Sequence, residues 1–171
     1  WPFRFLVRDD CPLAVVGEPS HLFEEPPKCN APAGYRWVAG ARKCDVAWDV
    51  MREYVRSQYI EQFRRYEEWF NTGAIPQEYA SGLRVAEDGI VSYGDYLYHK
   101  GENLEHYLAN LGLTDQNPYP IRTCAYVDAD GWRDNGWMTS DLTEGERQAW
   151  HKEVSDFIAK QPDDALLVSV D

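Results

Sequence analysis

The fold of this chain is decided by residues 45–73, which read DVAWDVMREYVRSQYIEQFRRYEEWFNTG. Seven apolar or aromatic side chains recur there at intervals of three or four, namely Trp48, Met51, Val55, Tyr59, Phe63, Tyr66 and Phe70. Because that spacing puts them on one stripe of an α-helix, residues 45–72 are predicted to form a single long helix that packs on the core. Asp45 is the expected N-cap, and Gly73 is expected to follow the last turn.

The segment before this helix favours short strands and one irregular stretch. Alternation of Phe3, Phe5 and Val7 with Arg4, Leu6 and Arg8 predicts a short edge strand, and residues 13–16 and 35–38 have β character. Between them, residues 17–34 are too rich in proline for a helix and are expected to form an ordered loop or an extended arm.

Two hairpins and a short helix are predicted after the long helix. Asp88-Gly89 suits a tight turn between strands at 83–85 and 90–93. Apolar residues at i, i+3, i+4 and i+7 predict a helix from Leu104, which Gly112 ends. A second hairpin is expected around residues 128–131, with Trp132 beginning the return strand.

The C-terminal segment predicts one more helix and one more strand. Thr143 and Glu146 fit a capping box for a helix whose apolar face includes Trp150. The apolar run 165–170 suits a strand that is buried on both faces. The whole chain, 1–171, is therefore predicted to be a single α+β domain, in which one long and two shorter helices pack on a mainly antiparallel sheet.

The charge of the chain is strongly negative and uneven. The 171 residues carry 17 basic and 29 acidic side chains, and 18 of the acidic ones lie after Thr72. This field repels phosphate, so direct nucleic-acid binding is not expected, whereas a partner protein with a basic surface would be attracted. The alternative is that the charge serves solubility. No run of about 18 apolar residues occurs, so no membrane span is expected and a cytoplasmic location is favoured.

The second hairpin, YVDADGWRDNGWM, is the candidate partner-binding site. Tryptophan is enriched at interface hot spots, and carboxylates around it would form a negative rim suited to a basic partner. The candidate binding residues are Trp132, Trp137, Asp128, Asp130, Asp134 and Asp141. In the alternative interpretation, the two tryptophans close one end of the core. The aspartates also resemble a calcium loop, but Trp132 stands where its third ligand belongs and Arg133 replaces its glycine.

Metal and catalytic sites have weaker support. His99, Glu102 and His106 could meet near the start of the short helix, as an open metal site or a general base, although surface histidines are the simpler interpretation. His151 follows the core-facing Trp150 and is expected to be exposed. No P-loop, G-x-S-x-G elbow or H-E-x-x-H motif is present. No catalytic residue, metal site or cofactor is therefore assigned.

The cysteines leave three alternatives open. Zinc could be held by Cys11, His21, Cys29 and Cys44, although the chain has no C-x-x-C pair. A disulfide between Cys11 and Cys29 would staple the proline-rich arm in an oxidising compartment. Reduced, partly buried thiols, including Cys124, are the leading interpretation.

The C-terminal third resembles small uncharacterised proteins encoded by actinobacterial phages. Those proteins have a V-x-x-D-G-x-W hairpin followed by Gly-x-Met, a helix and a closing apolar strand. Here Val127, Asp130, Gly131 and Trp132 lie together, with DGW in place of DGxW, and Gly136-Trp137-Met138 follows. The resemblance covers about 50 residues and implies a phage-encoded accessory protein that acts inside a bacterial cell.

Together these features predict a non-enzymatic acidic protein-interaction module, in one form an inhibitor that occupies a basic nucleic-acid-binding surface. The first alternative is a small metal-dependent enzyme that uses His99, His106 and nearby carboxylates. The second is a structural subunit of a larger particle, in which the arm at 17–34 reaches a neighbouring subunit.

Overall fold

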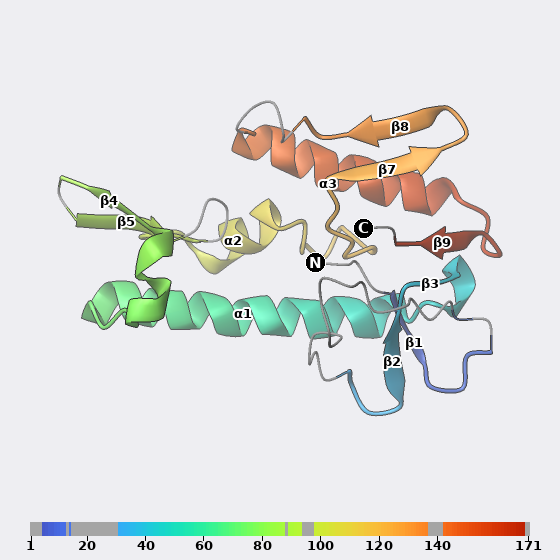
Figure 1. The fold of residues 1–171 in the computed structure, drawn as a ribbon, viewed down its shortest axis with the longest axis horizontal. Helices are drawn as coiled ribbons and strands as arrows, with labels where there is room; N and C mark the ends of the chain where they lie inside the picture. The colour runs from blue at the N-terminus through green and yellow to red at the C-terminus, as the bar shows by residue number, and fades with distance from the viewer. Residues whose placement is uncertain are drawn as a thin grey trace.

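The computed structural model describes residues 5–12, 14, 31–87, 89–93, 98–136 and 142–169 (Figure 1). The helices are α1 (Trp48–Thr72), α2 (Leu104–Asn110) and α3 (Glu144–Lys160), with short 3-10 turns at Lys43–Asp45 and Gln77–Gly82. The strands are β1 (Phe5–Arg8), β2 (Tyr35–Val38), β3 (Gly40–Arg42), β4 (Leu83–Ala86), β5 (Gly89–Tyr93), β6 (Tyr98–His99), β7 (Ala125–Asp128), β8 (Gly131–Asp134) and β9 (Leu166–Val168).

The long helix α1 forms where its apolar stripe predicts it. All seven stripe residues pack into the hydrophobic core. Gly73 ends the helix at φ 72°, a left-handed conformation that glycine adopts without steric cost. The predicted N-cap is wrong, because Asp45 belongs to the preceding 3-10 turn and Ala47 occupies the cap position.

The α+β class and the antiparallel pairing are confirmed, but the described strands are divided among four small sheets rather than one. These sheets are β1–β2, β3–β9, β4–β5–β6 and β7–β8. Both predicted hairpins are present, as β4–β5 and β7–β8. In Figure 1 the β7–β8 hairpin lies along α3, while β4–β5 lies near the far end of α1.

Two strands differ from their predicted burial. In β1, Phe5, Leu6 and Val7 are all buried, because the strand also contacts α1 and β3, so it does not alternate between core and solvent. In β9, Leu166 and Val168 are 56% and 49% exposed. The prediction that this strand is buried on both faces is therefore wrong, since only its Leu167 side packs on the core.

The core consists of two clusters joined along α1. One cluster contains β1, the first turns of α1 and the Trp150 face of α3. The other lies between the second half of α1, β6 and α2, and is rich in aromatic rings. Val55 packs against both clusters, so α1 connects them. Within the described residues, no helix combines the length and apolar character needed to cross a membrane.

A buried lysine ties the end of α3 to the other side of the core. Lys43 follows β3, and its Nζ donates to the backbone oxygens of Ala159 and Gln161 at 3.1 and 2.7 Å. The pairing of β3 with β9 lies beside it, with Ala41 opposite Leu167. Because the free carbonyls at a helix end need donors, Lys43 stabilises the C-terminus of α3.

Much of the predicted N-terminal organisation lies outside the described residues. This applies to the strand at 13–16, apart from Ala14, and to the proline-rich arm at 17–34 up to Asn30.

Candidate functional site

The β7–β8 hairpin has two faces that are built differently. Ala125 to Asp128 pair with Asp134 to Gly131, and Gly131 adopts φ 117°, a value that L side chains rarely reach. Because side chains alternate across a strand, Tyr126 and Arg133 share one face, and their neighbours Val127 and Trp132 share the other. The two faces are called the inner and outer face below.

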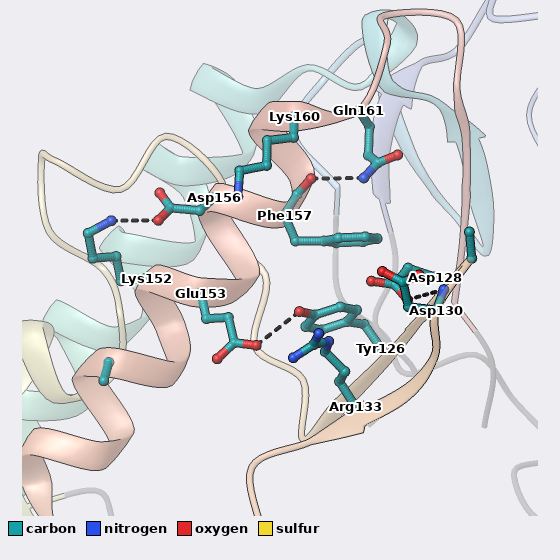
Figure 2. Close-up of a pocket in the computed structure, with 12 residues that line it drawn as sticks. Tyr126, Asp128, Asp130, Arg133, Lys152, Glu153, Asp156, Phe157, Lys160 and Gln161 are labelled. Carbon is teal, nitrogen blue, oxygen red and sulfur yellow. Dashed lines mark hydrogen bonds and ion pairs between the residues drawn. The ribbon is translucent and has the colours of Figure 1, made fainter.

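The inner face packs on α3 through stacked aromatic rings. Tyr126 stacks on Phe157 and on Trp150, with ring centroids 4.3 and 5.7 Å away. Its hydroxyl donates to Glu153 Oε1 at 2.9 Å, as Figure 2 shows. Burial, and next the carboxylate of Glu153, raise the pKa of Tyr126. The inner face therefore fixes the hairpin to the helix.

A shallow groove of about 630 Å³ lies between the inner face and α3 (Figure 2). Its lining carries charges of both signs, since Asp128 and Asp130 enter from the hairpin turn and Lys152 and Asp156 from α3. Lys152 Nζ and Asp156 Oδ2 form an ion pair at 2.6 Å. The groove therefore has acidic hairpin residues at its border, whereas the charges of Lys152 and Asp156 on α3 neutralise each other.

The outer face exposes a large apolar surface. Trp132 is 66% exposed and Val127, directly opposite it in the strand register, is 59% exposed. The indole Nε1 of Trp132 donates to Asp134 Oδ2 at 3.0 Å, which fixes the orientation of the ring. This exposure is inconsistent with the alternative that Trp132 closes one end of the core.

The aspartates of the site are arranged around the hairpin turn and its exit. Asp128 Oδ1 accepts the backbone N–H of Asp130 at 2.9 Å, and Asp134 Oδ1 accepts that of Gly136 at 2.8 Å. Asp130 and Asp134 are exposed. Of the predicted residues, Asp134 contacts Trp132 on the outer face, whereas Asp128 and Asp130 line the groove on the other side of the hairpin. Trp137 and Asp141 lie outside the described residues.

The sequence interpretation missed Val127 as part of this surface. The signal was available, because a two-residue turn at Ala129-Asp130 places Val127 opposite Trp132. The residues of α3 that border the groove could not be predicted in the same way, because no local pattern in a helix shows which strand the helix faces.

A second polar cluster lies where α2 meets α3. His106 lies between two carboxylates, with Nδ1 2.8 Å from Glu102 Oε1 and Nε2 2.7 Å from Glu144 Oε1. Asn110 donates to Glu102 at 3.2 Å, and Gln148 bridges Asn110 and Glu144. Partial burial alone lowers the pKa of His106, but the hydrogen bonds to Glu144 and Glu102 outweigh it and raise the pKa.

This cluster uses both nitrogens of the imidazole, so neither is open to a metal or a substrate. Glu102 and His106 meet as predicted, while His99 is exposed and contributes its backbone N–H to Glu102 Oε2 at 3.1 Å. Because Nδ1 and Nε2 lie on different edges of the ring, Glu102 and Glu144 do not converge on one point. No group of three or more His, Cys, Asp or Glu side chains among the described residues is arranged so that it could hold a metal ion.

His151 is not exposed as predicted. Its ring packs against Gly112, so that a Cβ at Gly112 would lie 2.6 Å from His151 Cγ. Burial, and next the charge of Arg122, lower the pKa of His151 to about 4. The residue is held neutral in the α2–α3 contact near neutral pH.

The cysteine alternatives remain predictions. Cys11, Cys44 and Cys124 form no disulfide with one another. Cys11 is partly buried as predicted, but the prediction is wrong for Cys44 and Cys124, which are exposed. The proposed zinc site and the proposed disulfide both require Cys29, and the zinc site also requires His21. These two residues lie outside the described part of the chain.

Comparison of the chain with protein-family models, with curated protein sequences and with solved structures finds no match. The functional argument therefore rests on the residues of this chain.

Proposed function

We propose that this protein is a non-enzymatic acidic interaction module, which holds a basic surface of a partner protein against the outer face of the β7–β8 hairpin. The observation that carries the proposal is the 66% exposure of Trp132 beside Val127. Large apolar side chains exposed side by side are more informative than a single exposed one, and tryptophan is a frequent interface anchor. The packing of Tyr126 on α3 gives this anchor a rigid support.

The charge around the anchor favours a basic partner. Asp134 lies beside Trp132, Asp128 and Asp130 lie at the turn of the same hairpin, and most of the net charge of −12 arises after Thr72. Complementary charge speeds encounter and selects among partners. In one form of this proposal, which the acidic charge favours, the module is an inhibitor that covers a nucleic-acid-binding surface of its target. The phage resemblance adds that it acts inside a bacterial cell.

The alternative, a metal-dependent enzyme using His99 and His106, has less physical support. Both nitrogens of His106 face carboxylates, so binding a metal or abstracting a proton would first require breaking one of two short hydrogen bonds. Metal analysis of the purified protein, with its melting temperature measured with and without a chelator, tests this alternative directly.

The experiment for the binding proposal is a pull-down from bacterial lysate with wild type, Trp132→Ala and Val85→Ala. Val85 is the matched control, because it is 68% exposed on the other hairpin. We expect a stoichiometric protein that wild type and Val85→Ala retain and Trp132→Ala loses. Washing with high salt should weaken retention, since charge attraction is screened.

Retention of the same protein by Trp132→Ala, or its equal loss from Val85→Ala, would contradict the proposed surface. If retention did not respond to salt, the proposed basic character of the partner would be contradicted, and an apolar contact would explain the binding.

A further inference from the structure

The outer face presents an aromatic ring and a carboxylate in a fixed relation. Trp132 Nε1 donates to Asp134 Oδ2, and Asp134 Oδ1 accepts from the backbone of Gly136, so both oxygens of the carboxylate are anchored. Both side chains are thus oriented before any ligand arrives, which lowers the entropy cost of binding. A carboxylate has about four lone-pair sites, so Asp134 can still accept from a further donor.

The described structure places no cation of the chain over the Trp132 ring. The cation–π contacts of the described residues pair Lys43 with Tyr119 and Arg122 with Tyr59. Arg133, next to Trp132 in sequence, points to the inner face and lines the groove (Figure 2). An exposed indole with a carboxylate at its edge is therefore available to an external cation.

We infer that Trp132 and Asp134 recognise an arginine side chain of the partner protein. The guanidinium lies over the indole face and donates to the Asp134 carboxylate, while Val127 contacts the aliphatic stem of the arginine. This inference rests on the proposed function, because it names the partner group that the same surface binds.

The chemistry favours arginine over lysine. A guanidinium is planar, so it can stack on an aromatic face while its N–H groups point sideways to an acceptor. It is also more weakly hydrated than an ammonium group, so covering it with an indole costs less. Lysine offers the same charge without the plane and is expected to bind more weakly.

The test uses NMR of the full chain labelled with ¹⁵N. The seven tryptophans give seven indole N–H signals, and the signal of Trp132 is the one that Trp132→Phe removes. The probes are three peptides, acetyl-Gly-X-Gly-amide, with X as arginine, lysine or citrulline. Citrulline has the shape of arginine without its charge, so it isolates the contribution of the cation.

We expect the arginine peptide to shift the Trp132 signal saturably, with a dissociation constant about fivefold lower than that of the citrulline peptide and with lysine between them. Asp134→Asn keeps an oxygen for the indole N–H and removes the charge, so it should reduce the preference for arginine to the part that the indole ring alone supplies. Glu87→Gln, which removes one exposed charge from the other hairpin, should leave that preference unchanged.

Equal dissociation constants for the arginine and citrulline peptides would overturn the inference, as would an arginine preference that is undiminished in Asp134→Asn or disappears in Glu87→Gln. The proposed function fails separately: if the pull-down depends on Trp132 but the titration shows no arginine preference, the surface is correct and the partner group is not.

Discussion

The β7–β8 hairpin and the α2–α3 junction both collect charged side chains around a ring, but they use the charges differently. At the junction, His106 is paired with Glu102 and Glu144, and the side chain of Glu102 is 3% exposed, while those of His106 and Glu144 are 42% and 45% exposed. At the hairpin, Trp132 is exposed beside Asp134. Charges that are paired inside the fold contribute to stability, whereas charges that face water beside an apolar surface are available to a partner.

The largest effect is expected at the junction, where the stability contributions of its two histidines change in opposite directions with pH. His151 has a pKa lowered to about 4 from 6.5, a difference on the order of 3 kcal/mol between its protonation states. Its neutral form stabilises the fold above pH 6.5, and this contribution is lost as pH falls towards 4. His106 has a raised pKa, so its contribution is present below 6.5 and is lost as pH rises through the raised value.

NMR titration of the imidazole Cε1–H signals checks these two directions. We expect the midpoint of the His106 titration to lie above pH 6.5 and the midpoint of the His151 titration to lie near pH 4. Glu144→Gln should move the His106 curve to lower pH and leave that of His151 in place. Overlapping curves would show that the two rings share one environment.

The next largest effect is expected from Gly112→Ala. The new Cβ would lie 2.6 Å from His151 Cγ, and the backbone is at φ 70°. Overpacking and the left-handed backbone together should cost about 3 kcal/mol of unfolding free energy in urea denaturation. Gly101→Ala is the control, because it has φ 82° but no atom within 4 Å. If Gly101→Ala lowered the unfolding free energy as much as Gly112→Ala, the contact with His151 would not explain the loss.

A smaller loss, about 2 kcal/mol, is expected from Glu102→Gln near pH 6. The substitution keeps the shape of a nearly buried side chain but removes the charge that pairs with His106. Glu105→Gln makes the same change at an exposed position of α2 and should alter the unfolding free energy by less than about 0.5 kcal/mol. Equal effects of the two variants would mean that the pairing contributes no stability.

The smallest effect on stability is expected at the hairpin. Trp132→Ala should change the unfolding free energy by less than about 0.5 kcal/mol, because its side chain is 66% exposed. The same variant should nevertheless lose the partner in the pull-down. A loss of stability comparable to that of Glu102→Gln would break the distinction between the two regions.

Local patterns predicted the elements of this fold but not their arrangement. The stripe of α1, the two hairpins and the capping box of Thr143 and Glu146 each depend on residues a few positions apart, and all are present, although Gly89 belongs to β5 and pairs with Ala86 instead of lying in the turn. The division into four sheets depends on distant pairings such as β3 with β9, which no local pattern specifies. The exposure of β9 was missed for the same reason.

The candidate site was predictable in part. The turn of the hairpin fixed its register, and therefore which residues share a face. The sequence could not show which face meets α3, because Tyr126 and Val127 are both apolar and lie on opposite faces. The burial of His151 was not predicted because α3 is covered on two sides. Trp150 faces the hairpin, and the next residue, His151, faces Gly112 after α2.

The contact of Lys43 with the end of α3 has a consequence for the order of folding. The residues it joins are 116 and 118 positions apart, so this contact and the β3–β9 pairing close a very long loop. Loop closure of that length is entropically costly, whereas α1 and the hairpins form from near neighbours. We therefore expect β9 to dock last, after the hairpin with Trp132 has formed, so that the exposed surface proposed to bind a partner is complete before the final strand is in place.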